Sequence, residues 1–174
     1  MLNFIYAAFS PGTTGASQVV QLVDVSAFSA SIAAGLVTAS ASAWFNRVAG
    51  DLGTTDTQFG LAIYACSGSP SAFPTVFSNA TSLGSYMGTI LTDDDVDTWQ
   101  PLGVGLLLPS GTDYLAVELR AIEDKENDFL DPEFDGHYAD SVLLNVNVVP
   151  VPAAVWLLGS GLLSLVAFRR RKRL

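Results

Sequence analysis

Residues 37–45 read Val37-Thr-Ala-Ser-Ala-Ser-Ala-Trp-Phe45, an unbroken alternation of two kinds of side chain. In an extended strand, successive side chains point to opposite faces of the sheet. One face therefore carries Val37, three alanines and Phe45, and the other carries Thr, Ser and Trp44. A period of two without helical spacing predicts a β-strand with one buried face.

The same alternation recurs on both sides of this strand. It is clear at four further stretches and weaker at two, namely residues 59–64, 102–108, 115–121 and 140–148, then 18–23 and 84–91. In the last strand it assigns Val142, Leu144 and Val146 to the buried face. Residues 27–34 are predicted to form one short helical turn. Short strands joined by Gly-, Pro- and Asp-rich turns predict an all-β fold, an antiparallel β-sandwich.

The charges divide the chain into an acidic body and a basic tail. Five of the eight Lys and Arg residues stand together, as Arg169, Arg170, Arg171, Lys172 and Arg173. Residues 1–168 contain the other three basic residues and all 17 Asp and Glu, which gives this part of the chain a net charge of −14. Nucleic-acid binding needs positive charge to displace counterions from phosphates, so we expect no nucleic-acid partner. One cysteine and one histidine exclude a disulfide framework and multi-Cys or multi-His metal sites.

Residues 141–168 carry no charge, and residues 153–168 are almost entirely apolar. With residues 148–152 in front, this stretch reaches the roughly 20 residues that a helix needs to cross a bilayer. Trp156 lies near its start, as interfacial aromatic side chains do, and the basic tail follows its end. The segment predicts one C-terminal transmembrane helix with the tail in the cytoplasm and the body on the far side. An ordinary C-terminal anchor and a buried core helix are the alternatives.

Residues 149–174 resemble the PEP-CTERM sorting signal, in which a Pro-Glu-Pro-like motif, a transmembrane helix and a basic tail follow an exported domain. Pro150, Val151 and Pro152 occupy the motif, with Val151 at the position of the family's Glu. The resemblance implies processing by exosortase, a membrane-embedded cysteine transpeptidase-like enzyme. It also implies a precursor anchored in the inner membrane of a Gram-negative bacterium, and a product at the cell surface or in the exopolysaccharide matrix of a biofilm.

Export requires an N-terminal signal, but residues 1–9, MLNFIYAAF, have no basic start and no long apolar run. We therefore expect residues 1–148 to be an N-terminally incomplete β-sandwich ectodomain and residues 149–174 to be the sorting signal. Insertion of the C-terminal helix by itself, as a tail anchor, is the alternative.

Two later stretches, LPSGTDYLAVELRA at 108–121 and HYADSVLLNV at 137–146, resemble the second half of galactose-binding-like jelly rolls. This resemblance implies a jelly-roll-like sandwich of the kind used by many carbohydrate-binding modules. In those folds an aspartate at the start of the last strand often helps to bind a structural calcium ion. Asp140 occupies the matching place.

Residues 123–140 hold eight acidic side chains, which repel one another unless they are solvated or neutralised by a cation. Oxygen ligands suit Ca²⁺, so Asp131, Glu133, Asp135 and Asp140 are the candidate ligands of a structural calcium site. A hydrated acidic loop is the alternative.

A second acidic cluster consists of Asp93, Asp94, Asp95 and Asp97. It fails the EF-hand template because Thr98 replaces the required glycine. It is either a weaker calcium candidate or a solvated turn.

Trp44 shares its predicted strand face with serines and with Asn46. An exposed indole on a flat sheet face can stack against a sugar ring while polar neighbours bind its hydroxyl groups. Trp44 and Asn46 are therefore the candidate carbohydrate-binding residues. A covering loop or second layer over Trp44 is the alternative.

Catalysis is weakly supported by the sequence. His137 has no G-x-S-x-G nucleophile motif to serve, and Cys66 is expected to be a small apolar packing residue. Glu118 is expected on a solvated strand face with Arg120. We therefore predict a non-enzymatic envelope or matrix protein with possible carbohydrate binding. A polysaccharide-acting hydrolase and a purely structural surface protein are the alternatives.

Overall fold

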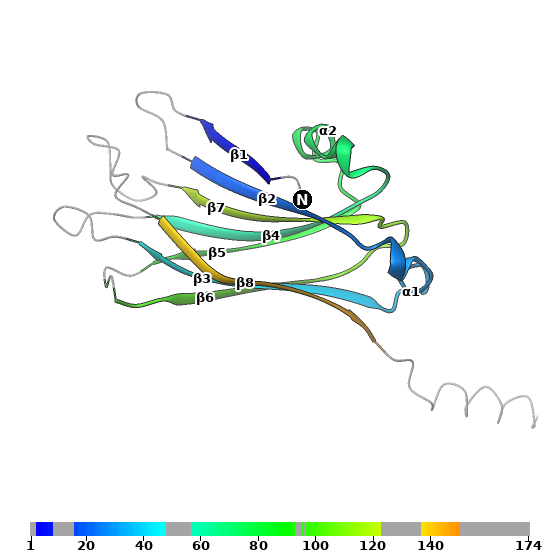
Figure 1. Ribbon diagram of the computed structural model, residues 1–174. Coiled ribbons are helices and arrows are strands. Elements are labelled where there is room, and N and C mark those ends of the chain that lie inside the picture. Colours follow the sequence, from blue (N-terminus) through cyan, green and yellow to red (C-terminus); the bar gives the residue numbers. More distant parts are fainter. Residues whose placement is uncertain are drawn as a thin grey trace, which may run out of the picture.

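The computed structural model describes residues 3–8, 16–47, 57–92, 95, 97–122 and 137–149. Within these ranges, eight strands carry the fold (Figure 1): β1 (Asn3–Ala8), β2 (Ala16–Asp24), β3 (Val37–Arg47), β4 (Gln58–Cys66), β5 (Gly84–Leu91), β6 (Gln100–Leu107), β7 (Tyr114–Ile122) and β8 (His137–Val148). The described residues also include two short helices, α1 (Ser29–Ala33) and α2 (Phe73–Ser78). Each helix follows a single 3-10 turn, Ser26–Phe28 and Pro70–Ala72.

The strands form two antiparallel sheets that pack face to face (Figure 1). The larger sheet has the order β1-β2-β7-β4-β5, and the smaller has the order β6-β3-β8. The prediction of an antiparallel β-sandwich is therefore confirmed. The two weaker strand predictions are confirmed as well, because they coincide with β2 and β5.

The main core lies between the two sheets. The three alanines of β3 are buried there, and Leu61 and Ile63 of β4 are fully buried opposite them. Phe45 of β3 stacks on Phe59 of β4 with ring centroids 4.8 Å apart. The inward face predicted for residues 37–45 is thus the inward face of the smaller sheet.

A second, smaller cluster covers part of the outer face of the five-stranded sheet. Phe73 of α2 packs there with Cys66, Tyr114 and Val20, and Figure 1 shows α2 above that face. Cys66 is buried, as expected of a packing residue. The five-stranded sheet is therefore covered on both sides at this end.

One irregularity distinguishes β8 from the other strands. Leu143 stands opposite Ser42, but Asp140 stands opposite Trp44, so β8 has one more residue than β3 between these two pairs. Ser141 lies at this point with φ of 51°, a left-handed conformation that few non-glycine residues adopt. The extra residue makes a β-bulge.

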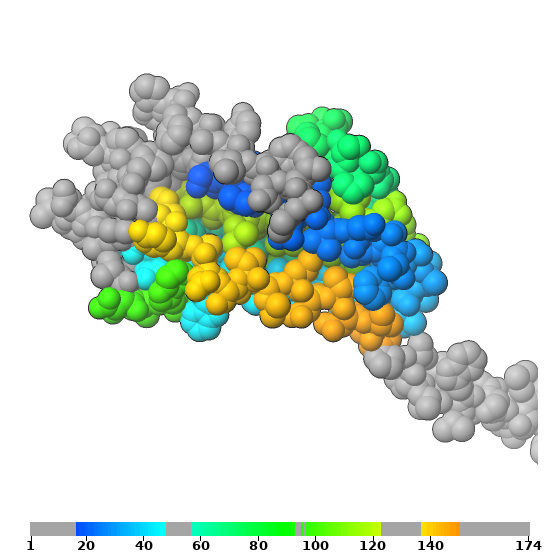
Figure 2. All heavy atoms as spheres, viewed as in Figure 1, coloured from blue at the N-terminus to red at the C-terminus, as the bar shows by residue number. Residues whose placement is uncertain are grey.

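Because of the bulge, the predicted burial of Val142 is wrong. Val142 was expected in the core but is 47% exposed, whereas Leu144 and Val146 pack against the core as expected. An inserted residue changes which side chains face inward, because the side-chain period of a strand is two. Figure 2 shows β8, in yellow to orange, along the surface of the molecule.

Several predictions fall on residues that the structure does not describe. They are the Pro150, Val151 and Pro152 motif, the apolar segment 153–168 and the basic residues 169–173. Within the described part of the chain, no helix combines the length and the hydropathy needed to span a bilayer.

Candidate carbohydrate-binding face

The centre of the outward side of the three-stranded sheet is polar and open, and the exposed Leu107 and Leu143 flank it. Its middle strand β3 presents Ser40, Ser42 and Trp44 outward, between β6 on one side and β8 on the other. We call this surface the open face and define it by Ser40, Ser42, Trp44, Gly103, Gly105 and Asn145. Because β3 is paired on both edges, its outward side chains are held in a fixed row.

Two glycines make the open face hollow. Gly103 and Gly105 of β6 stand opposite Ser42 and Ser40. A Cβ added at either glycine would meet only a β3 carbonyl oxygen, at 3.9 and 3.8 Å, so the space above them is open. Asn145 of β8 pairs with Ser40 from the other side. The result is a shallow trough floored by hydroxyl and backbone groups.

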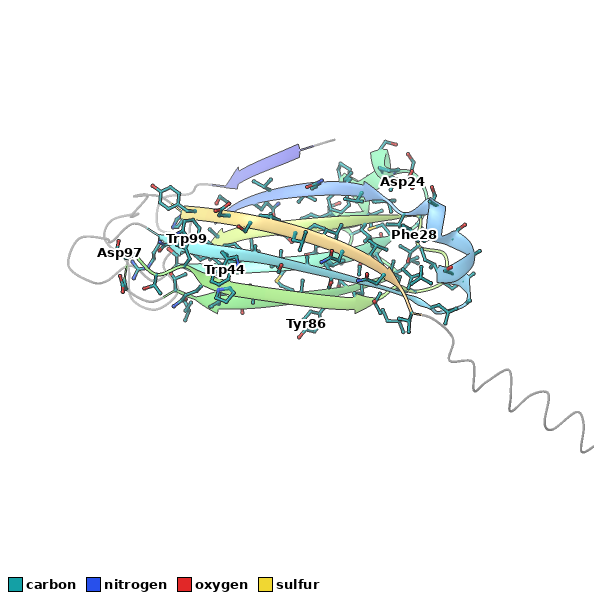
Figure 3. All side chains as sticks on the ribbon, turned by 60° about the horizontal axis from the view of Figure 1, so that its bottom comes forward. Asp24, Phe28, Trp44, Tyr86, Asp97 and Trp99 are labelled. Carbon is teal, nitrogen blue, oxygen red and sulfur yellow. The ribbon has the colours of Figure 1, made fainter. Side chains whose placement is uncertain are left out.

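The trough has a volume of about 620 Å³. Tyr86, an exposed residue of β5, borders it on the β6 side, and Figure 3 shows its ring projecting from that edge. Ligand sites of proteins have volumes of roughly 300–1,000 Å³. The trough is therefore large enough for a few sugar rings, although it is open to solvent along its length.

Trp44 follows Ser42 by two residues on the outward side of β3, just beyond the residues that line the trough. It is 43% exposed, so the predicted exposure of this indole is confirmed. Its strand neighbours are Pro101 on β6 and Asp140 on β8. Trp99, a second exposed tryptophan, precedes Pro101 by two residues, and Figure 3 shows both indoles at this end of the sheet. This end of the open face offers aromatic surface for stacking.

Asn46 has a different environment from the one expected. It is only 6% exposed, and its Oδ1 accepts a hydrogen bond of 2.7 Å from the backbone N–H of Arg47. The open face instead offers the amide of Asn145, which is exposed. The sequence pattern of β3 could not reveal Asn145, because its position depends on the pairing of β8 with β3.

The acidic candidates are only partly described. Asp140 is exposed, and its Oδ1 accepts a hydrogen bond of 2.6 Å from the backbone N–H of Ser141. The other predicted calcium ligands, Asp131, Glu133 and Asp135, lie outside the described residues. Among the residues that are described, no three His, Cys, Asp or Glu side chains gather as a metal site would require. Calcium binding therefore stays a prediction.

The second acidic cluster is described at Asp95 and Asp97, while Asp93 and Asp94 lie outside the described residues. Asp95 Oδ1 accepts a hydrogen bond of 3.0 Å from the backbone N–H of Asp97. This bond and a further one from the Thr98 side chain lower the pKa of Asp95. These two local hydrogen bonds stabilise the ionised carboxylate of Asp95, so its lowered pKa does not require a metal ion.

His137 and Cys66 have structural surroundings. His137 Nε2 lies 2.9 Å from Thr57 Oγ1, and the imidazole packs edge-on against Phe59. Burial raises the pKa of the Cys66 thiol, which disfavours the reactive thiolate. Neither residue lines the trough.

Glu118 overturns the expectation of a solvated strand face. It is only 1% exposed, on the outer face of the five-stranded sheet, where the hydroxyl of Tyr64 donates a 2.7 Å hydrogen bond to its Oε2. Burial, together with this bond and the charge of the carboxylate, raises the pKa of Tyr64. Arg120 is half-buried on the same face and lies over Gly60, so close that a Cβ there would come within 2.8 Å of Arg120 Cγ.

The comparisons with known proteins leave the function open. No protein-family model matches the chain, and no curated protein matches it. Among solved structures, the enzymatically active domain of tailspike protein 4 from bacteriophage CBA120 is similar to this chain, with 11% sequence identity and a TM-score of 0.44. The match covers 83% of this chain and 15% of that chain. The resemblances to PEP-CTERM proteins and galactose-binding-like folds therefore stay predictions.

Proposed function

We propose that this protein is an exported, non-enzymatic protein of the bacterial cell envelope or exopolysaccharide matrix, and that its sandwich binds polysaccharide through the open face. One observation carries the binding proposal. Trp44 is exposed and follows Ser42 by two residues on the outward side of β3, beside a trough lined by Ser40, Ser42 and Asn145. An indole can stack against a sugar ring while hydroxyl and amide groups exchange hydrogen bonds with its hydroxyls.

The strand order supports a jelly-roll-like scaffold as the finer description of the fold. A jelly roll consists of eight strands in two sheets. In the orders β2-β7-β4-β5 and β6-β3-β8, strands from the first half of the chain pair with strands from its second half, such as β2 with β7 and β3 with β8. The departure is β1, which pairs with β2 in the larger sheet instead of lying beside β8.

For localisation, the proposal rests on the sequence. The apolar segment 153–168 would anchor the precursor in the inner membrane, and the tail 169–173 would hold that end in the cytoplasm. The Pro150-Val-Pro motif would then direct exosortase to release the body to the cell surface or matrix. Comparing the mass of the mature protein in cells with and without exosortase tests this. An identical mass in both would mean that the segment is a permanent anchor.

The binding proposal is tested with the full 174-residue chain, in a detergent without a sugar headgroup. Binding to a glycan array is measured beside release of reducing ends from the same glycans. We expect binding without turnover. Trp44→Ala should weaken binding roughly fivefold, which corresponds to about 1 kcal/mol for a lost aromatic contact.

Met87→Ala is the matched control. Met87 is an exposed apolar residue of β5, where it pairs with Ala62 of β4, and both strands belong to the five-stranded sheet. Equal binding by wild type, Trp44→Ala and Met87→Ala would refute the proposed face. Turnover of a glycan would support the hydrolase alternative, and binding to none would leave a purely structural role.

A further inference from the structure

We infer that the polysaccharide held by the open face carries free amino groups, and that Trp44 and Asp140 together bind one of its ammonium groups. This inference rests on the proposed function and narrows it to polymers of amino sugars that are not N-acetylated. It is carried by the bulge in β8 and by the charges around Trp44.

The bulge decides which side chain stands opposite Trp44. The register that runs from Val37 to Ser42 would, if continued, pair Trp44 with Ser141. The extra residue in β8 pairs it with Asp140 instead. Bulges often re-aim a side chain beside a functional site. Here the bulge exchanges a hydroxyl for a carboxylate beside the exposed indole.

The strand register places Trp44 and Asp140 at directly opposite positions. Cβ atoms of directly opposite residues in an antiparallel pair lie about 4.5–5.5 Å apart. Both Trp44 and Asp140 are exposed, and the backbone N–H of Ser141 holds one oxygen of the carboxylate at 2.6 Å. The face of an indole attracts a cation within about 6 Å of its ring. An ammonium group between them would meet the π face on one side and the carboxylate on the other.

The surrounding charges favour a cation and disfavour an anion. Of the residues that the structure describes, only Arg47 and Arg120 are Lys or Arg, and the single histidine, His137, has its Nε2 2.9 Å from Thr57 Oγ1. Arg47 is buried, and Arg120 belongs to the five-stranded sheet. Asp97 is exposed, and Figure 3 shows it at the same end of the molecule as Trp44. Polymers of uronic acids would therefore be repelled at this end, while ammonium groups would be attracted.

The experiment compares three polymers of similar length: a β-linked glucosamine polymer, its fully N-acetylated form and a polymer of uronic acid. Binding of the full chain is measured in chelator, so that calcium cannot occupy Asp140. The variants are Asp140→Asn, which removes the charge at constant shape, and Asp24→Asn. Asp24 is an exposed acid at the opposite end of the molecule (Figure 3), so its variant has the same net charge as Asp140→Asn.

We expect the glucosamine polymer to bind most tightly and the uronic acid polymer not to bind. Asp140→Asn should weaken binding of the glucosamine polymer roughly two- to fivefold, as for an exposed ion pair, and leave the N-acetylated polymer unaffected. Asp24→Asn should match wild type. Affinity should also fall as salt is added, and as the pH rises through the pKa of the polymer's amino groups.

Two results would overturn the inference. Equal binding of the amino and N-acetylated polymers by the wild-type chain would do so while leaving the proposed function intact. Equal losses in Asp140→Asn and Asp24→Asn would do so as well, since binding would then reflect only the net negative charge. If none of the three polymers binds, the inference fails, and the proposed function fails with it only if the glycan array also shows no binding.

Discussion

The outer faces of the two sheets have opposite characters, although both sheets are antiparallel and share one core. On the five-stranded sheet, α2 and its cluster cover one end, and the buried Glu118 accepts a hydrogen bond from the half-buried Tyr64. On the three-stranded sheet, the serines, glycines and Trp44 face solvent. The closed face therefore contributes to stability, and the open face is free to bind. Variants on the two faces should separate these roles.

The largest effect is expected on the closed face, from Phe73→Ala. Phe73 of α2 is buried and its ring lies 5.4 Å from that of Phe77. Removing a buried aromatic side chain lowers the free energy of unfolding by about 3–5 kcal/mol. Trp44→Ala, on the open face, should change it by no more than about 0.5 kcal/mol. Chemical denaturation of both variants measures the difference, and equal losses would contradict the division of roles.

The next effect concerns calcium near Asp140, at the edge of the open face. A ligand that binds only the folded state at a hundredfold excess over its dissociation constant raises stability by about 2.7 kcal/mol. If the predicted site exists, the melting temperature should be higher in calcium than in chelator, and Asp140→Ala should reduce that gap. Asp97→Ala, in the separate acidic turn, should leave the gap intact. A melting temperature that is the same in calcium and chelator, at fixed ionic strength, would show that these acids are only solvated.

A smaller effect is expected from Tyr64→Phe, which removes one hydroxyl from the closed face. Glu118 Oε2 would lose its 2.7 Å donor while the carboxylate stays buried. A buried acceptor left without its partner costs about 1–3 kcal/mol. Tyr86→Phe is the control, because Tyr86 is exposed beside the trough. Denaturation that finds both variants equal to wild type would mean that the Tyr64–Glu118 bond contributes nothing.

The same variant should change the alkaline limit of stability. The pKa of Tyr64 is raised in the folded protein, and that of Tyr114 is raised to about 12. An unfolded tyrosine has a pKa of about 10, so the unfolded chain releases these protons first. The stabilisation is complete below pH ~10 and is lost as the pH rises through the folded pKa values. Tyr64→Phe should therefore lose less stability than wild type between pH 9 and pH ~11.5, as measured by denaturation at several pH values.

The sequence predicted the strands better than it predicted the exposure of their outer faces. Alternation assigned the inward side chains of β3 correctly because the period of two is a local property of the chain. Whether an outward side chain is covered depends on other elements, so the burial of Glu118 and Asn46 was not predictable from their own strands. The bulge at Ser141 was also missed, since no glycine marks it in the sequence. Asn145, Gly103 and Gly105 could not be assigned to the site from the sequence, because only the register of β6 and β8 against β3 places them beside Ser40 and Ser42.

The smallest effect on stability, with a large effect on binding, is expected from Gly105→Val in the trough. A Cβ at Gly105 meets nothing closer than a carbonyl oxygen at 3.8 Å, and valine favours strands. The free energy of unfolding should therefore stay within about 0.5 kcal/mol of wild type.

Binding should fall, because the new side chain fills the floor on which a sugar would rest. Gly88→Val is the matched control on β5, where a Cβ would lie 3.0 Å from Val104 Cγ1. That variant should lose stability through crowding against Val104 and Leu102, while it adds no side chain to the floor of the trough. Denaturation and polymer binding are measured on both variants. If the open face is the binding surface, Gly105→Val should lose binding but keep its stability, and Gly88→Val should lose stability but keep binding. A Gly105→Val protein that binds polymer as well as wild type would exclude the trough as the site.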